Sequence, residues 1–309
     1  MWSSINQRLK RRWYEHKCAD IYATPPIQPR NDGLAIFSMI GTAVMTPYLV
    51  AVKSLHHHLN RGRIVIMDDG TLTDQDRLIL HTHLGNPQIL SIRDVNVGAC
   101  PRGGTWERLL TILDMSAADY VIQLDSDTVT VGPIPQVLRA IDENRSFTLL
   151  GAETQIDSIL DVRTFTQQHF QGRAPSKEDR EGHIQGATES VLCQLRVAGL
   201  DQPSYVRGCS GFAGFMRGGD RRLAEAFSQA ASAVLGSRRW AEWGTEQITS
   251  NFVIANHVGA KVLPPVLYAN YWGSPLNDVR FVHYIGTYRW QGFTYQRSAL
   301  EAIQALKSA

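Results

Sequence analysis

Two aspartates, Asp125 and Asp127, follow the apolar run YVIQL with one serine between them. Residues two apart in extended chain point the same way, so both carboxylates can converge on one cation. A buried carboxylate costs free energy unless it is paired or binds a cation. Carboxylate oxygens, together with the oxygens of a bound diphosphate, are ligands that suit Mg²⁺ or Mn²⁺. The spacing therefore indicates a divalent-metal site. The alternative is that an aspartate caps the turn before Gly132 and Pro133.

The elements that must position this pair alternate between strand and helix. Apolar runs predict strands at residues 34–40, 63–69, 88–93 and 120–124. Helical patterns lie between them at 46–59, 71–84 and 105–117, the first with Thr46 as N-cap and Pro47 at the first helical position. Such alternation implies a doubly wound α/β fold with a parallel sheet, and ligands of these sheets bind beyond the carboxyl ends of the strands. Asp125 and Asp127 fall at that edge.

The second half of the chain has a mixed pattern. Short strands are predicted at 147–153 and 211–218, and helices at 219–235, 245–258 and 298–309. Residues 157–202 are predicted as helices interrupted by the polar segment 171–183, which we expect to be a mobile loop. Neither GxGxxG nor GxxxxGK[ST] occurs in the chain. If a nucleotide binds, a metal must therefore supply the phosphate contacts.

Composition excludes several classes of protein. The 309 residues are 43% apolar and 19% charged, as in ordinary globular proteins, and the net charge of +2 argues against a nucleic-acid binder. No apolar run has the length of a membrane span or the form of a signal peptide. The cysteines are far apart and are predicted to be reduced core residues of a cytoplasmic protein: Cys18, Cys100, Cys193 and Cys209.

Residues 1–17 combine basic and apolar side chains. Five cations accompany the single acid Glu15, while Ile5, Leu9 and Trp13 recur at helical spacing. A basic amphipathic helix of this kind could lie on an anionic membrane surface, or it could dock on its own domain and keep a solvated basic face. Three prolines before the first strand separate this arm from the rest of the chain.

The segment TWERLLTILDMSAADYVIQLDSD resembles the core of glycosyltransferase family 8, whose retaining enzymes have a GT-A fold. In that family a T-x-x-R-L helix precedes an L-D-x-D metal motif. The resemblance implies that Asp125 and Asp127 contact Mn²⁺ and that Arg108 reaches the sugar nucleotide. From the residues alone, Arg108 could equally be a solvated helix charge.

RFVHYIGTYRW resembles the H-x-x-G-x-x-K-P-W motif of the family through His283, Gly286 and Trp290. The resemblance implies that His283 completes the metal shell, which would favour Mn²⁺ over Mg²⁺. The alternative for a lone histidine in an apolar strand is a core residue. Arg289 stands where the family has lysine, and the proline is missing, so a cation for the diphosphate is kept while its geometry differs.

Two further segments match the family. GCSGFAGFMRG resembles an F-N-S-G strand through Ser210 and Gly211, with cysteine in place of asparagine. GTEQITSN resembles a D-Q-x-x-x-N segment, which makes Glu246 and Gln247 the candidates for stabilising an oxocarbenium-like transition state. The alternative is an ordinary polar helix start, with Thr245 as the cap and Glu246 complementing the helix dipole.

The usual uracil-reading acids of the family are absent after the first strand, which runs FSMIGTA. Backbone groups near Met39, Gly41 and Thr42 could still hold a base. Asp69, at the end of the second strand, shapes a turn or approaches the ribose. Ser126 completes the predicted donor-binding residues.

Two clusters of side chains have open interpretations. The aromatic residues Trp240, Trp243, Tyr271 and Trp272 could form a sugar-stacking platform or belong to the core. Successive histidines at 56–58 point in different directions on a helix and cannot share a metal, so we predict a partly solvated face.

Together these features predict a metal-dependent, retaining glycosyltransferase that uses Mn²⁺ or Mg²⁺. The expected donor is a nucleotide-diphosphate sugar, with uridine as the expected nucleoside, and the acceptor is a glycan, lipid-linked or protein hydroxyl. We predict no nucleic-acid partner, a cytoplasmic location, and peripheral contact of residues 1–17 with the inner face of a membrane. Residues 1–32 are predicted as the arm, and 33–309 as one GT-A domain with a nucleotide-sugar half (33–150) and an acceptor half (151–309).

Three alternatives stay open. An inverting GT-A enzyme would use a carboxylate such as Glu246 as general base. A catalytically silent sugar-nucleotide-binding module is suggested by Cys209, by Arg289 and by the missing uracil-reading acids. A nucleotidyltransferase shares the fold and the metal carboxylates, but no glycine-rich, arginine-containing loop follows the first strand.

Overall fold

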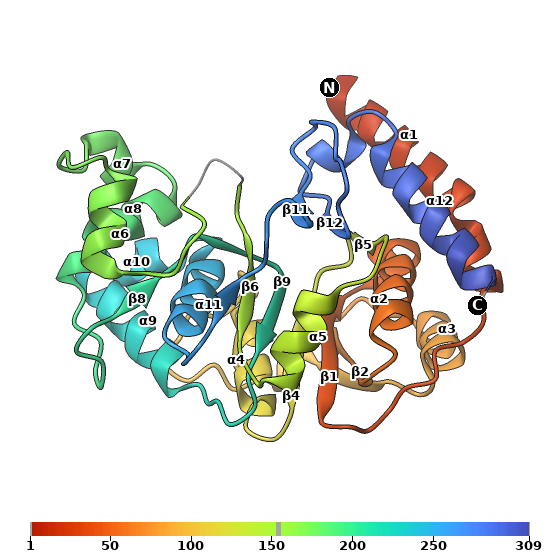
Figure 1. Cartoon of the computed structure of the whole chain (residues 1–309), viewed down its shortest axis with the longest axis horizontal. Helices are drawn as coiled ribbons and strands as arrows, with labels where there is room; N and C mark the ends of the chain where they lie inside the picture. Colours follow the sequence, from red (N-terminus) through yellow and green to blue (C-terminus); the bar gives the residue numbers. More distant parts are fainter. Residues whose placement is uncertain (1, 153–155, 309) are drawn as a thin grey trace. The chain divides into compact units, whose positions relative to one another are not determined.

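Strands and helices alternate along the chain, as the apolar periodicity predicts. The computed structural model describes residues 2–152 and 156–308, with side chains from residue 8 onward. Contacts divide the chain into two compact units. The first contains Met1–Arg93, Ile122–Arg139 and Pro264–Ala309, and the second contains Asp94–Val121 and Ala140–Leu263 (Figure 1).

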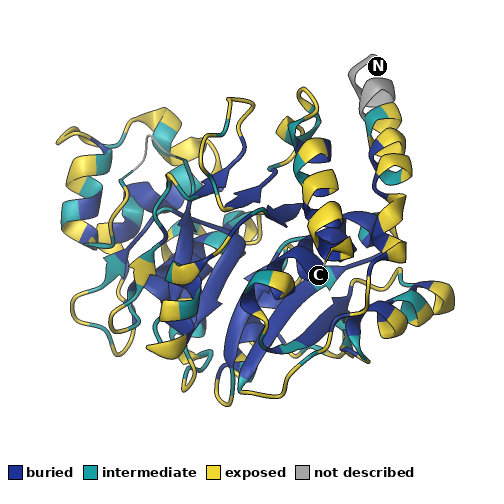
Figure 2. Cartoon of the chain, turned by 45° about the vertical axis from the view of Figure 1, so that its right-hand side comes forward, coloured by how far each residue is buried: buried dark blue, intermediate teal, exposed yellow. Residues whose placement is uncertain are grey.

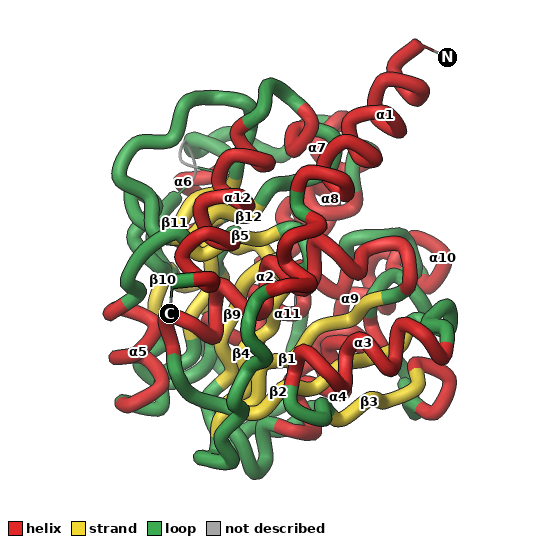
Figure 3. Tube along the Cα trace, turned by 90° about the vertical axis from the view of Figure 1, so that its right-hand side faces the viewer, coloured by secondary structure: helices red, strands yellow, loops and turns green. Residues whose placement is uncertain are grey.

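The sheet of the first unit is built on three parallel strands. These are β1 (Leu34–Ile40), β2 (Arg63–Asp68) and β3 (Gln88–Ser91), which run side by side in Figure 3. β4 (Tyr120–Leu124) lies next to β1, where the Ser38 hydroxyl donates to the Leu124 carbonyl oxygen at 2.7 Å. β1, β2 and β4 are almost entirely buried (Figure 2), as expected for strands covered on both faces.

Helices α2 (Met45–Leu59) and α3 (Asp74–Leu84) connect these strands. Thr73 caps α3 in a capping box with Asp76. The predicted start of α2 was wrong, because a 3₁₀ turn over Thr42–Val44 runs directly into the helix. Thr46 is therefore the second helical residue, and its hydroxyl is hydrogen-bonded to that of Tyr22 at 3.0 Å.

A small sheet completes the first unit. Its order is β11 (Tyr268–Asn270), β12 (Phe281–His283), β5 (Thr128–Thr130), with β11 parallel and β5 antiparallel to β12. The remaining elements of this unit are α1 (Trp2–Lys17), α12 (Thr294–Lys307) and the 3₁₀ turns Ala19–Ala23 and Tyr288–Trp290. The 3₁₀ turn Ile92–Asp94 and α5 (Pro135–Asp142) each begin in this unit and end in the second.

Helix α1 packs beside α12 (Figure 1). Tyr14 is fully buried and stacks on Tyr295 at 4.4 Å, and the Lys10 ammonium donates to the Trp290 carbonyl oxygen at 2.6 Å. The docked face is not the predicted apolar stripe, since Leu9 is 60% exposed and Trp13 38%. The side chains of residues 2–7, including Ile5, lie outside the described residues.

The second unit contains its own strands and several helices. β10 (Lys261–Val262) pairs parallel with β6 (Phe147–Leu150), which pairs antiparallel with β9 (Gly208–Phe215). β7 (Leu160–Asp161) pairs antiparallel with β8 (Ser204–Tyr205). The helical elements are α4 (Trp106–Met115), α6 (Val162–His169), α7 (Lys177–Glu181), α8 (Ile184–Val191), the 3₁₀ turn Leu192–Gln194, α9 (Arg222–Leu235), α10 (Ser237–Trp240) and α11 (Thr245–Ala255).

Several expectations for this unit are corrected. The segment 171–183 is not a continuous loop, because it contains α7, which Ser176 and Asp179 stabilise through a capping box. β9 begins three residues earlier than predicted, so Ser210 and Gly211 lie inside a buried strand.

Three further expectations concern the cysteines, membrane-spanning helices and the type of sheet. All four cysteines are free, as predicted, but Cys193 is exposed and is not a core residue. None of the described helices has the length and apolar character needed to cross a bilayer. The predicted mainly parallel α/β sheet with a mixed region is confirmed.

Candidate functional site

Two aspartates and one histidine of the first unit converge. One ligand atom from each of Asp125, Asp127 and His283 lies within 4.8 Å of the other two. His283 Nε2 is 3.3 Å from Asp127 Oδ1 and 3.9 Å from Asp125 Oδ2. His283 is 6% exposed and Asp127 8%. Carboxylate oxygens with an imidazole nitrogen form a donor set that suits Mn²⁺ and related divalent ions.

The strands explain why these residues meet. Asp125 and Asp127 occupy the turn between β4 and β5, and the register pairs His283 with Thr128, the first residue of β5. The Tyr284 N–H donates to the Asp127 carbonyl oxygen at 2.8 Å. The Thr128 hydroxyl donates to the Asp125 carbonyl oxygen at 2.9 Å and so closes the turn. The Thr128 hydroxyl thus helps to hold the turn that carries both carboxylates.

Asp127 has two basic neighbours, His283 and Arg289. Burial alone would raise the pKa of this carboxyl group, but His283 and Arg289 together hold it below its ordinary value. Arg289 Nη2 lies 2.8 Å from Asp127 Oδ2. The same guanidinium donates through Nε to the Gly286 carbonyl oxygen at 2.7 Å, and Gly286 has the positive φ of 47° that favours glycine. The predicted residues Gly286 and Arg289 therefore belong to this cluster.

A second polar cluster lies in the second unit. Glu246 is 2% exposed and Arg108 6%. Arg108 Nη2 lies 3.2 Å from Glu246 Oε1 and 3.3 Å from the Ser210 hydroxyl. Gln247 Oε1 accepts hydrogen bonds from the Ser210 N–H at 3.2 Å and from its hydroxyl at 3.3 Å. Arg108 is thus a buried ion-pair partner and not a solvated helix charge.

Thr105 also belongs to this cluster, although the sequence did not single it out as a site residue. Its hydroxyl donates to Glu246 Oε2 at 2.9 Å, and its backbone has a φ of 73°, which is unusual for a β-branched residue. The T-x-x-R-L pattern was its only signal. The predicted cap is wrong: Gly244 occupies the cap position of α11, and the Thr245 hydroxyl accepts from Trp106 Nε1 at 2.9 Å.

The predicted nucleoside-side residues lie where β1 and β2 end. Asp69 Oδ1 accepts from the Thr71 N–H at 2.9 Å, which is the turn-shaping role. The Thr42 hydroxyl donates to the Thr71 carbonyl oxygen at 2.5 Å. A Cβ on Gly41 would lie 2.1 Å from the Thr71 hydroxyl oxygen and 2.3 Å from Asp69 Oδ2, so a larger residue would require both side chains to move. Met39 lies in β1 beside this turn.

The structure separates the four aromatic residues. Trp240 is 1% and Tyr271 3% exposed, so both are core residues. Trp243 is 73% exposed in the second unit, and Trp272 is 42% exposed in the first. Trp272 forms an edge-to-face pair with Tyr288 at 5.2 Å, next in sequence to Arg289.

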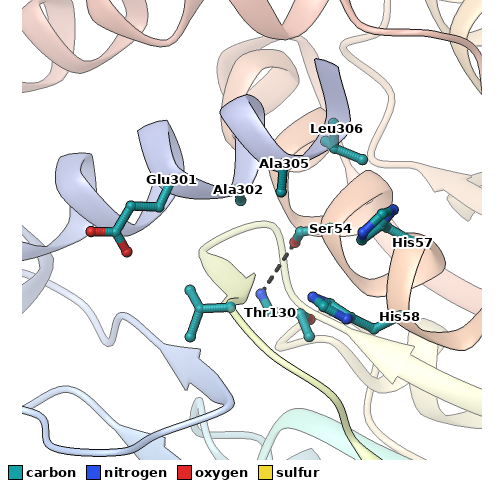
Figure 4. Close-up of a pocket in the computed structure, with 9 residues that line it drawn as sticks. Ser54, His57, His58, Thr130, Glu301, Ala302, Ala305 and Leu306 are labelled. Atoms are coloured by element: carbon teal, nitrogen blue, oxygen red, sulfur yellow. Dashed lines mark hydrogen bonds between the residues drawn. The ribbon is translucent and has the colours of Figure 1, made fainter. Parts of the chain in front are cut away.

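A small cavity of about 90 Å³ lies in the first unit between α2, β5 and α12 (Figure 4). His57, His58 and Glu301 line it, together with Ser54 and Thr130, and none of the predicted site residues does. His58 is half-buried, in agreement with the partly solvated face predicted for 56–58. His56 is buried and His57 is exposed.

At the level of sequence, the chain matches no protein-family profile and no curated protein. Its fold matches solved glycosyltransferases. An active-site mutant of LgtC, a galactosyltransferase, aligns with a TM-score of 0.50 at 10% identity, over 87% of this chain and 95% of that chain. Mouse xyloside xylosyltransferase 1 aligns with a TM-score of 0.41 at 12% identity, over 81% and 97% of the two chains. Core-mannan synthase A from Aspergillus fumigatus, in its Mn/GDP form, aligns with a TM-score of 0.45 at 9% identity, over 90% and 87%.

Identities this low show likeness of fold alone. The chain has the fold of GT-A glycosyltransferases, which confirms the predicted resemblance at that level.

Proposed function

We propose that this protein is a metal-dependent glycosyltransferase that moves a sugar from a nucleotide-diphosphate sugar to a hydroxyl acceptor. The observation that carries the proposal is the Asp125, Asp127 and His283 cluster at the end of β4 in a GT-A fold. Fold alone does not define function, so the argument rests on the chemistry of this cluster.

Asp125, Asp127 and His283 would hold the metal, for which we propose Mn²⁺, because a nitrogen ligand joins the oxygens. When bound, the ion supplies positive charge at the oxygen that becomes negative as the diphosphate leaves. Arg289 lies at the Asp127 carboxylate and offers a second cation to the diphosphate. Ser126 stands between the two metal-binding aspartates and is proposed to contact the donor.

Arg108, Ser210, Gly211, Glu246 and Gln247 are proposed to face the donor sugar. Both oxygens of Glu246 have partners, Oε1 in Arg108 and Oε2 in Arg108 and Thr105. Glu246 is thus engaged with Arg108 and Thr105, and we propose transfer with retention rather than inversion. The anomeric configuration of the product distinguishes the two mechanisms.

The nucleoside is proposed to be uridine, held at the turn formed by Met39, Gly41, Thr42 and Asp69. The acceptor is proposed to be a glycan, lipid-linked or protein hydroxyl, and the exposed Trp243 and Trp272 are its candidate stacking surfaces. We propose a cytoplasmic protein that contacts a membrane peripherally through α1. If tight donor binding occurred without turnover over many acceptors, the silent binding module would be favoured instead.

The experiment that tests the proposal is calorimetric binding of a panel of nucleotide-diphosphate sugars, with and without Mn²⁺. We expect one nucleotide class to bind with a requirement for Mn²⁺. Asp127→Asn removes a ligand charge and should reduce Mn²⁺-dependent binding and turnover by at least about 100-fold, since loss of a charged contact costs about 3 kcal/mol. Asp142→Asn, at the end of α5, is the control variant.

If the wild type bound no donor, or if Asp127→Asn bound the donor as the wild type does, the proposed donor site would be wrong.

A further inference from the structure

His283 lies in the middle strand of the small sheet and has a neighbour on each side. The register pairs it with Asn270 of β11 and with Thr128 of β5. Thr128 directly follows Asp127, whose carbonyl oxygen accepts the Tyr284 N–H at 2.8 Å. The backbone of the sheet therefore holds Asn270, His283 and Thr128 in one row and places Asp127 directly beside it.

The two ring nitrogens of His283 face different groups. Nδ1 lies 2.9 Å from the side-chain oxygen of Asn270, whereas Nε2 faces Asp127 at 3.3 Å and Asp125 at 3.9 Å. An amide oxygen can only accept a hydrogen bond, so Nδ1 must carry the proton that this contact uses. A neutral imidazole with its proton on Nδ1 has its lone pair on Nε2. Nε2 can then share that lone pair with a cation held by the oxygens of both aspartates.

Burial makes this contact important. Asn270 and His283 are each 6% exposed, so bulk water cannot readily replace the amide oxygen. Without an acceptor for Nδ1–H, the ring would gain by moving its proton to Nε2 or by turning. Either change would take the lone pair away from Asp125 and Asp127.

We infer that Asn270 is a positioning residue, whose amide oxygen fixes the proton of His283 on Nδ1 and directs Nε2 toward the metal. The inference rests on the proposed metal-binding role of Asp125, Asp127 and His283. Histidine ligands of metals generally donate their other N–H to such a partner, and loss of the partner weakens metal binding about 10- to 100-fold. An amide in this place adds no third negative charge to the cluster.

The test measures Mn²⁺ affinity in the absence of nucleotide, using the electron paramagnetic resonance signal of free Mn²⁺ and the full chain. Asn270→Leu keeps the size of the side chain but cannot accept a hydrogen bond. We expect it to bind Mn²⁺ about 10- to 100-fold more weakly. Asn270→Asp restores an acceptor and should bind Mn²⁺ at least as tightly as the wild type.

Asn256→Leu is the matched control. Its amide donates to the carbonyl oxygens of Ser204 and Phe252 in the second unit, so this variant also loses a structural asparagine. Its Mn²⁺ affinity should equal that of the wild type. Equal affinity in Asn270→Leu and the wild type would overturn the inference.

Asp127→Asn separates the inference from the proposed function. If Asp127→Asn also binds Mn²⁺ normally, the metal site itself is wrong. If only Asp127→Asn loses affinity and Asn270→Leu does not, the metal site stands and the role of Asn270 falls.

A second measurement needs no folded Asn270 variant. Nitrogen NMR of ¹⁵N-histidine-labelled wild type, saturated with diamagnetic Mg²⁺, shows which nitrogen of His283 carries the proton, and His283→Gln assigns the signal. We expect the proton on Nδ1. A proton on Nε2 would overturn the inference.

Discussion

Arg289 contacts the same carboxylate that a metal ion would bind. Its Nη2 lies 2.8 Å from Asp127 Oδ2, with the two side chains 25% and 11% exposed. A divalent cation must therefore compete with this ion pair, whereas a diphosphate gives the guanidinium a new partner. We predict effects of opposite sign for Arg289→Ala: Mn²⁺ alone should bind about fivefold more tightly, because a partly exposed pair is worth about 1 kcal/mol. Nucleotide diphosphates should bind about tenfold more weakly.

Calorimetric titrations with MnCl₂ alone and then with nucleotide diphosphate measure both affinities. Arg280→Ala, which removes an exposed cation of the same unit, should change neither. If both affinities fall together in Arg289→Ala, the arginine supports the structure of the cluster and does not compete with the metal.

At the scale of elements, α8 carries a carboxylate into the interior of the second unit. Glu189 is fully buried and lies 3.2 Å from Arg207, 3.2 Å from the Tyr205 hydroxyl and 3.3 Å from His169. Burial outweighs the nearby arginine and raises the pKa of Glu189 from 4.5 to about 7. The folded state thus keeps a proton that the unfolded chain releases. Stability from this group is fully present below the unfolded pKa of 4.5 and is lost as pH rises through about 7.

We therefore predict that Glu189→Gln, which cannot ionise, gains stability relative to the wild type between pH 5 and pH 8. The relative gain should approach about 3 kcal/mol, since each unit of pKa shift corresponds to about 1.4 kcal/mol. Urea unfolding at each pH measures it. Glu181→Gln, an exposed residue of α7, should follow the wild type at every pH. Parallel pH profiles of Glu189→Gln and the wild type would show that Glu189 is already ionised in the fold.

Elements with a local signal were predictable from the sequence. β1 and β4 have the predicted bounds, because continuous apolar runs between breakers specify a buried strand. The start of β9 was missed, since Gly208, Cys209 and Ser210 have little strand propensity. Pairing with β6, which places Cys209 opposite Leu149, makes them a strand. α7 was missed for a similar reason, as its capping box lies in a wholly polar segment.

Some residues of the candidate site likewise have a local sequence signal, whereas others are brought together only by long-range contacts. Asp125 and Asp127 stand out because a strand should not end in two carboxylates without a partner. Asn270 and Thr105 were missed, because only strand register and long-range packing bring Asn270 to His283 and Thr105 to Glu246, which is 141 residues away. Motif resemblance, and not periodicity, led to the cluster formed by Arg108, Ser210 and Glu246.

On the scale of the whole molecule, the net charge of +2 hides a local excess on α1. Arg8, Arg12 and Lys17 are exposed, as are the apolar Leu9 and Trp13. The Trp13 ring contacts the exposed Phe293 at 5.2 Å, and the Lys17 ammonium lies 5.9 Å from the same indole. Since Tyr14 docks the helix, the remaining face combines cations with apolar rings, as interfacial helices do. This face supports the proposed contact with an anionic membrane surface.

Replacing Arg8, Arg12 and Lys17 together by glutamine tests this contact. Each cation near an anionic surface is worth about 1 kcal/mol, so the triple variant should bind vesicles containing phosphatidylglycerol about 100-fold more weakly than the wild type. Sedimentation with vesicles measures this affinity. The control is Arg238→Gln, which removes an exposed cation of α10.

The electrostatic and apolar contributions of α1 differ in their dependence on salt. Screening shortens the reach of the cations as ionic strength rises, while insertion of Leu9 and Trp13 is much less affected. Binding of the wild type should therefore weaken as salt is added, down to a residual level that the Trp13→Ala substitution abolishes. The wild type should bind neutral phosphatidylcholine vesicles weakly at every ionic strength. Absence of wild-type sedimentation would contradict the proposed membrane contact, and equal sedimentation of the wild type and the triple variant would show that the cations do not contribute to it. A salt-independent wild type would make the cations incidental and leave the exposed rings as the whole of the contact.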